Sequence, residues 1–193
     1  VTDEVLFVRS GKSEELENKE ATVKLNGNTI KGITIDGQAV SADDYTVNDG
    51  VITLKGSFLN TLEGSADGVK HEVVVSYNPS FGTPSENGLG KNSVLPSTTA
   101  FTVVVKKHAD AVAITNDISK TYNGKTVKEP QFTVDSGREV VIEYKKAGED
   151  DSAYTTTAPK AVGNYVVRVS VAEDDNYVAA SAEKDFKIKK KSS

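Results

Sequence analysis

Residues 158–188 read APKAVGNYVVRVSVAEDDNYVAASAEKDFKI, two apolar runs separated by an acidic turn. The residues on one side of the first run are Tyr165, Val167, Val169 and Val171. Successive side chains of a strand point to opposite faces, so this period of two predicts a half-buried antiparallel strand. Gly163 predicts a tight turn before the strand, and the residues from Asp174 to Asn176 predict the turn after it. The stretch therefore predicts a strand, a corner and a second strand, and it raises the question whether the acidic corner binds a metal.

The same alternation recurs along the chain. It is found in HEVVVSY (71–77), FTVVVKK (101–107) and VVIEY (140–144). Between the runs lie NGN, DG, NDG, NPS and SG, residues that accept positive φ or preset a turn. The pattern predicts an all-β protein.

One segment, KGSFLNTLEGSADG (55–68), has helical spacing instead. Phe58, Leu59 and Leu62 fall on one side of a helix, with Ser57 as the expected N-cap and Gly64 as the expected stop. We expect one or two turns that close one end of a sandwich.

The chain has 193 residues, enough for one large or two small domains. Two lysines and a run of small residues in VKKHADAVAI precede a fresh set of strands, so we expect two tandem domains, 1–109 and 110–193. Their formal charges are −4 and −1. Residues 78–100 form an insertion or hairpin tip of unusual length, which points to a functional or mobile loop.

Composition excludes several function classes. The formal charge of −5 argues against nucleic acid, whose binding requires several lysines or arginines on phosphates. No apolar window is long enough for a membrane span, and the absence of Cys excludes disulfides and thiol chemistry. The chain starts at Val1 with no visible signal peptide, so we expect a piece of a longer protein.

Candidate catalytic and metal-binding residues are few. The acidic clusters 149–151 and 173–175 lack the alternating D-x-D-x-D-G spacing of a calcium loop, so we expect solvated turns there. His71 and His108 have no partner at ligand spacing, and no G-x-S-x-G elbow is present. We therefore predict no enzyme, no metal and no cofactor.

The first half shows, in order, a GN turn, a GI strand, a DYTV strand, a V-x-(I/L)-K strand and an (F/Y)L-x-x-L helix within residues 25–65. This succession resembles the Ig-like X-type modules that accompany catalytic domains in bacterial cellulases and cellulosomal scaffoldins. The resemblance covers most of residues 20–77 and implies an Ig-like sandwich with one short helix. The long 78–100 segment departs from the compact pattern of that family.

The second half resembles the MBG-type β repeats of bacterial surface proteins. The residues at signature positions are Tyr122, Gly124, Pro130, Tyr144, Tyr154, Ala158, Pro159, Gly163, Tyr165, Asn176 and Tyr177. The resemblance implies a small β domain, Ig-like or β-grasp-like, with an adhesive or structural role. It implies that the acidic corner is a repeat signature retained for its turn geometry.

We therefore expect non-catalytic spacer and interaction modules of a larger bacterial protein, extracellular or on the cell surface, with neighbouring domains of the same chain as partners and a monomeric state. The alternative is an adhesin-like module that binds a polysaccharide or a host glycoprotein through the 78–100 loop, with Phe81 as the candidate ligand-binding residue. The terminal KIKKKSS is either a wall- or lipid-directed tail or, as we favour, the exposed face of a last strand that runs into a linker.

Overall fold

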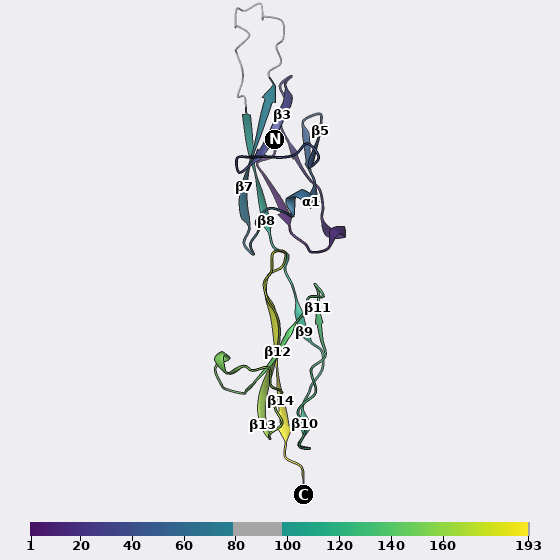
Figure 1. Ribbon diagram of the computed structural model, residues 1–193, viewed down its shortest axis with the longest axis vertical. Helices are drawn as coiled ribbons and strands as arrows, with labels where there is room; N and C mark the ends of the chain where they lie inside the picture. Colours follow the sequence, from purple (N-terminus) through teal and green to yellow (C-terminus); the bar gives the residue numbers. More distant parts are fainter. Residues whose placement is uncertain (79–97, 193) are drawn as a thin grey trace, which may run out of the picture. The chain divides into compact units, whose positions relative to one another are not determined.

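The computed structural model describes residues 1–78 and 98–192. The chain divides into two compact units, Val1–His108 and Ala109–Ser193, here called unit 1 and unit 2. Figure 1 shows that strands make up nearly all of the regular structure in each. The prediction of an all-β chain is confirmed.

The described residues of unit 1 contain eight strands, one 3₁₀ turn and one short helix. They are β1 (Glu4–Val8), η1 (Ser13–Glu15), β2 (Lys19–Thr22), β3 (Thr29–Ile35), β4 (Gln38–Ala39), β5 (Tyr45–Asn48), β6 (Val51–Leu54), α1 (Gly56–Leu59), β7 (Val69–Asn78) and β8 (Thr98–Lys106). They form a five-stranded sheet in the order β1-β8-β7-β3-β4 and a three-stranded sheet in the order β2-β6-β5. β1 pairs in parallel with β8, so the first and last strands of unit 1 are neighbours.

The two sheets of unit 1 share one apolar core. Val73 and Val75 of β7 and Val103 and Val105 of β8 are fully buried, as the alternation predicts. The smaller sheet contributes Ala21, Ile52 and Leu54 to the same cluster. Burial of both inner faces explains why the period of two identified these strands.

Hairpin turns in unit 1 occur where the sequence has Asn or Asp before Gly. Asp36 and Gly37, between β3 and β4, have φ angles of 49° and 80°. Two consecutive positive φ angles match the twist of a tight two-residue hairpin, and Asp-Gly is among the pairs that accept them. The turn chemistry thus fixes the β3–β4 register, in which Ile35 lies opposite Gln38.

The short helix lies where the sequence predicts it, but its predicted ends are wrong. It runs over Gly56–Leu59, with Lys55 at the N-cap position and no side-chain cap from its own segment. The side-chain amide oxygen of Asn18, 38 positions earlier in the sequence, accepts the Gly56 N–H at 2.9 Å. Asn18 therefore caps the helix in place of the expected Ser57. A Cβ atom at position 56 would lie 2.5 Å from the Glu17 carbonyl oxygen. This distance is too short for a non-bonded contact, so the position requires glycine.

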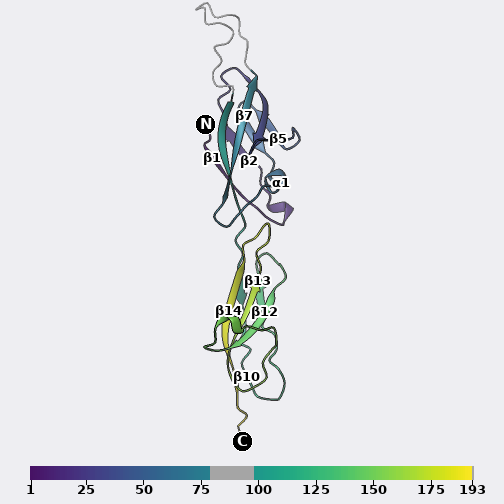
Figure 2. The same cartoon turned by 60° about the vertical axis from the view of Figure 1, so that its left-hand side comes forward.

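Unit 2 contains six strands and one 3₁₀ turn. They are β9 (Val112–Ile114), β10 (Lys120–Thr121), β11 (Phe132–Val134), β12 (Val141–Lys146), η2 (Asp151–Ala153), β13 (Gly163–Val171) and β14 (Ala180–Lys189). A four-stranded sheet has the order β10-β14-β13-β12, and β9 pairs with β11 in a second, two-stranded sheet. Figure 2 shows β12, β13 and β14 side by side.

The core of unit 2 lies on the inner face of the larger sheet. Tyr165 stacks on Phe186 with ring centroids 5.5 Å apart, and Tyr144 meets Phe186 edge-on at 6.2 Å. Ile114 of β9 packs against this cluster. Ile114 belongs to the two-stranded sheet, so both sheets of unit 2 contribute to its core.

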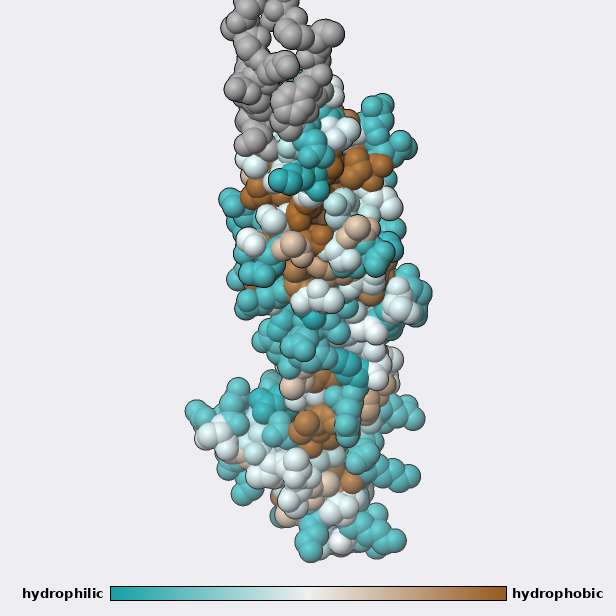
Figure 3. All heavy atoms as spheres, turned by 45° about the horizontal axis from the view of Figure 1, so that its top comes forward, coloured by the Kyte–Doolittle hydropathy of each residue, from teal (hydrophilic) through white to brown (hydrophobic). Residues whose placement is uncertain are grey.

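In the described residues, no helix combines the length and the apolar character needed to cross a membrane. On the face shown in Figure 3, apolar side chains form small patches interrupted by hydrophilic ones.

Candidate functional site

Phe81, the candidate ligand-binding residue, and residues 79–97 lie outside the described residues. The prediction that the 78–100 loop binds a ligand therefore stays a prediction. The other sequence candidates, namely the acidic clusters and the two histidines, can all be placed.

The acidic corner 173–175 is organised by Arg138, which sequence reasoning did not single out. One Arg138 nitrogen, Nη2, lies 2.9 Å from Asp110 Oδ2 and 2.9 Å from the Val178 carbonyl oxygen. Nη1 lies 3.3 Å from Asp174 Oδ2, and the guanidinium covers the Tyr177 ring at 4.9 Å. Arg138 thus provides the positive charge that a metal ion would supply to such a corner.

Asp174 shapes the turn itself. Its Oδ1 accepts the N–H groups of Asn176 and Tyr177 at 2.8 and 2.7 Å. Burial raises the pKa of Asp174, but these backbone hydrogen bonds and the Arg138 charge outweigh burial and lower the pKa below its ordinary value. The carboxylate is therefore ionised and committed to the turn and to Arg138.

The other acidic cluster, 149–151, is likewise used locally. Asp150 Oδ1 accepts the Ser152 N–H at 2.9 Å and caps the 3₁₀ turn η2. Asp151 pairs with Lys145 at 2.8 Å. Among the described residues, no group of three or more His, Asp or Glu side chains is arranged to hold a metal ion.

His71 is buried on β7, with only 5% of its surface exposed. Its Nδ1 lies 2.6 Å from Asp36 Oδ2, and its Nε2 lies 2.8 Å from the Glu63 carbonyl oxygen. Both neighbours accept hydrogen bonds, so the ring satisfies both contacts only when each nitrogen carries a proton. The hydrogen bond from His71 lowers the pKa of Asp36 below its ordinary value. His71 links the β3–β4 turn to the segment before β7, which is a structural role.

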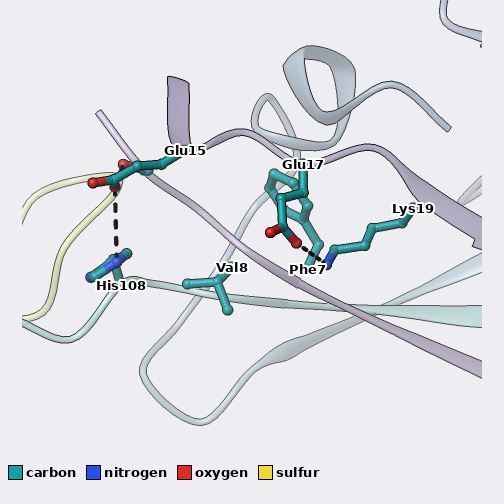
Figure 4. A pocket seen from close by; sticks show the side chains of 7 residues that line it. Phe7, Val8, Glu15, Glu17, Lys19 and His108 are labelled. Carbon is teal, nitrogen blue, oxygen red and sulfur yellow. Dashed lines mark hydrogen bonds and ion pairs between the residues drawn. The ribbon is translucent and has the colours of Figure 1, made fainter. Parts of the chain in front are cut away.

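His108 lies at the rim of a cavity of about 280 Å³ in unit 1, shown in Figure 4. Phe7 and Val8 line its apolar side, and Glu15 lies 3.9 Å from His108 Nε2. The Ser10 hydroxyl donates to Glu15 at 2.5 Å, and this hydrogen bond is the largest cause that lowers the pKa of Glu15. An ionised, already paired carboxylate is a poor general acid, so Glu15 is not suited to that role in this cavity.

A larger cavity, of about 510 Å³, lies in unit 2. Lys120, Lys125 and Lys128 line it together with Asn116 and Thr126. Sequence reasoning missed this site, because its residues are spread over a turn-rich segment without a recognised motif. Their positive charge within a chain of net charge −5 is the signal that could have revealed it.

Two exposed aromatic side chains were also missed. Tyr122 is 44% exposed and Phe132 is 37% exposed. By contrast, Tyr77, Tyr144, Tyr154, Tyr165 and Tyr177 are buried.

Comparisons with known proteins give two family matches. Residues 4–84 match the family model described as Carbohydrate binding domain X2, and residues 111–192 match the model described as MBG domain. Neither description names an enzyme. No curated protein matches the chain.

Similar solved structures include a tri-modular GH5 (subfamily 4) endo-beta-1,4-glucanase from Bacillus licheniformis, complexed with cellotetraose. Its identity is 11% and its TM-score 0.36, over 95% of this chain and 37% of that one. The N-terminal four Ig domains of Dscam1 isoform 9.44 are similar at 13% identity and a TM-score of 0.35, over 97% of this chain and 43% of that one. The chain thus spans less than half the length of these structures. The family matches confirm both resemblances, that to X2 modules at residues 4–84 and that to MBG domains at residues 111–192.

Proposed function

We propose that the chain is a non-catalytic spacer, with surfaces for interaction, in a larger secreted or cell-surface bacterial protein. The observation that carries the proposal is the course of the chain, which enters and leaves each unit at different points along its strands. A spacer requires this course because its neighbours must be held at opposite ends.

In unit 1 the course follows from the parallel pairing of β1 with β8. Five consecutive residue pairs join them, from Glu4 opposite Thr102 to Val8 opposite Lys106. Parallel strands run in the same direction, so the chain enters where β1 begins, opposite Thr102 in the middle of β8, and leaves further along that direction, where β8 ends at Lys106.

In unit 2 the course is set by the Arg138 corner and by β14. Asp110, at the start of the unit, is tied through Arg138 to the Val178 carbonyl, just before β14 begins. β14 then extends over ten residues to Lys189, a span of about 33 Å. The chain therefore leaves unit 2 at the far end of β14.

The chemistry of the described side chains supports a structural role. Asp174, Asp36 and Glu15 are hydrogen-bonded or ion-paired carboxylates whose pKa values lie below the ordinary range. None is poised to exchange a proton near neutral pH.

The proposal is tested by pulling single molecules of the chain from both ends between two folded marker domains. A spacer is expected to resist extension and then unfold in two events, one for each unit. Extension at low force without discrete unfolding events would refute the proposed role. The absence of Cys makes it simple to attach handles through introduced cysteines.

A second candidate function is glycan binding by unit 1, favoured by the match of residues 4–84 to a family described as a carbohydrate binding domain. Phe81 and the 78–100 loop remain the proposed contact. On a glycan array, Phe81→Ala is expected to abolish any retention of the chain, whereas Phe132→Ala, a change of an exposed aromatic in unit 2, is the control. Equal binding by wild type and Phe81→Ala would exclude this residue.

A further inference from the structure

Charge is strongly segregated within unit 2. Residues 116–128 and 184–191 contain eight lysines and two aspartates, a net charge of +6. The rest of residues 110–193 carries five basic and twelve acidic residues, a net charge of −7. One part of a small domain thus attracts anions while the remainder repels them.

The fold brings the two lysine-rich segments together. β10 pairs in parallel with the end of β14, with Lys120 opposite Ile188 and Thr121 opposite Lys189. The Tyr122 N–H donates to the Lys189 carbonyl oxygen at 2.8 Å, and the Ser119 hydroxyl accepts the Lys187 N–H at 3.0 Å. Figures 1 and 2 both show β10 beside the C-terminal end of β14.

The cavity of about 510 Å³ lies on the first of these segments. Lys120 is fixed in the wall of the cavity, since its Nζ contacts Asn123 Oδ1 and the carbonyl oxygens of Lys125 and Thr126. Lys125 and Lys128 are exposed. The ion pairs within the described residues of unit 2 use Arg138, Lys145 and Arg168 as their cations, so Lys125 and Lys128 are available to a ligand.

Asp117 is the only carboxylate among the residues that line this cavity. Hydrogen bonds with Ser119, followed by the charges of Lys184 and Lys189, lower its pKa below the ordinary value. Asp117 is therefore ionised at neutral pH and offsets one of the three lysine charges on the lining. The lining keeps a net positive charge.

The remaining lining groups suit a hydroxyl-rich ligand. Asn116, Asn123, Ser119 and Thr126 offer amide and hydroxyl groups, which both donate and accept hydrogen bonds. Tyr122 does not line the cavity itself, but it stands in the sequence between the lining residues Lys120 and Asn123, and its side chain is 44% exposed. An exposed tyrosine presents an apolar ring with a polar tip, a surface against which a sugar ring can pack.

We propose that this lysine-rich surface, formed by residues 116–128 and the end of β14, binds an anionic, hydroxyl-rich glycan polymer that carries carboxylate or phosphodiester groups. The lysines attract the charged groups, the amide and hydroxyl side chains bind the sugar hydroxyls, and Tyr122 packs against a ring. The site does not depend on the spacer role, and it consists of unit 2 residues alone.

The full chain is to be tested on immobilised polygalacturonate, on a phosphodiester-linked hexose polymer and on neutral dextran. We expect retention on one or both anionic polymers and none on dextran, with the two anionic arms identifying the charged group. Retention is expected to weaken steeply with salt, because binding releases counterions from the polymer.

Lys125→Gln with Lys128→Gln is expected to weaken binding about tenfold, because two charges that face the polymer are lost. Lys24→Gln with Lys70→Gln removes the same charge from exposed lysines of unit 1 and is expected to leave binding unchanged. Tyr122→Ala keeps the charge and is expected to weaken binding as well. Circular dichroism is used to verify that each variant is folded.

Three results would overturn the proposal. The first is equal weakening by the unit 1 control, which would indicate non-specific ion exchange. The second is full binding by Tyr122→Ala, which would remove the sugar-ring contact. The third is binding to phosphatidylglycerol vesicles or to single-stranded DNA without binding to either anionic glycan polymer.

Discussion

Arg138 joins three parts of unit 2 that are distant in sequence. It contacts Asp110 at the start of the unit, Asp174 in the acidic corner and the Val178 carbonyl before β14. The Asp110 side chain has 0% exposure. Burial raises the pKa of Asp110, but hydrogen bonds from Ser136 and Arg138 outweigh this effect and lower it. A buried carboxylate of this kind depends on its cationic partner.

Arg138→Ala is expected to reduce the free energy of unfolding of unit 2 by about 3 kcal/mol, because Asp110 is left buried and unpaired. Arg138→Lys is expected to recover only part of the loss, since an ammonium group cannot form the same fork of hydrogen bonds. Urea unfolding followed by circular dichroism measures both changes, with Lys160→Ala as an exposed control. A change below about 1 kcal/mol for Arg138→Ala would contradict the role assigned to this residue.

The Asp36–His71 pair predicts a pH dependence in unit 1. The pKa of Asp36 in the fold is below its ordinary value of 3.8, so its stabilising effect is complete above that value and is lost as the pH falls through the lower folded pKa. Asp36→Asn is expected to be less stable than wild type at neutral pH, with a difference that shrinks as the pH falls below 3.8. Thermal unfolding at a series of pH values measures this, and a difference that grows below pH 3.8 would contradict it.

These residues also mark the limit of what sequence reasoning could find. The acidic corner was correctly interpreted as a turn because consecutive carboxylates do not match the spacing of a calcium loop. Its partner Arg138 lies 36 positions before Asp174, and no local pattern connects the two. Likewise, no local pattern in the sequence connects His71 to its partners, Asp36 and the backbone carbonyl of Glu63.

Among the elements, β1 illustrates both the strength and the limit of alternation. Phe7 is 1% exposed and Leu6 is 49% exposed, so neighbouring residues face opposite sides of the sheet. Alternation identified the inner faces of β7, β8 and β13, which are long enough to display it. Strands of two residues, such as β4 and β10, carry no such signal and become visible only through pairing.

Phe7→Ala is expected to cost about 3 to 5 kcal/mol, because it empties part of the unit 1 core. Leu6→Ala on the same strand is expected to cost less than about 1 kcal/mol, because half of that side chain is already in water. Denaturant unfolding of the two variants gives the comparison. Similar losses for both would mean that β1 does not sit on the edge of the sandwich in the described register.

At the scale of the whole molecule, the predicted domains 1–109 and 110–193 remain to be tested as independent folding units. Each half has its own apolar core among the described residues. Each fragment, expressed alone, is therefore expected to unfold cooperatively, with a midpoint close to that of the corresponding transition in the full chain. A fragment that shows no cooperative transition would refute the boundary.

A spacer must carry load between its two ends. In unit 1 we expect the resistance to pulling to depend on the parallel β1–β8 pair. Pulling through cysteines introduced at Asp3 and Ala109 loads all hydrogen bonds of this pair at once. Pulling through Asp3 and Ala100, which lie at the same end of the two strands, opens the bonds one after another.

The most direct test is the unfolding force of unit 1 in these two geometries at the same pulling speed. Forced unfolding reports the barrier along the pulled direction, so we expect a several-fold higher force for the Asp3–Ala109 attachment. Equal forces in the two geometries would contradict it.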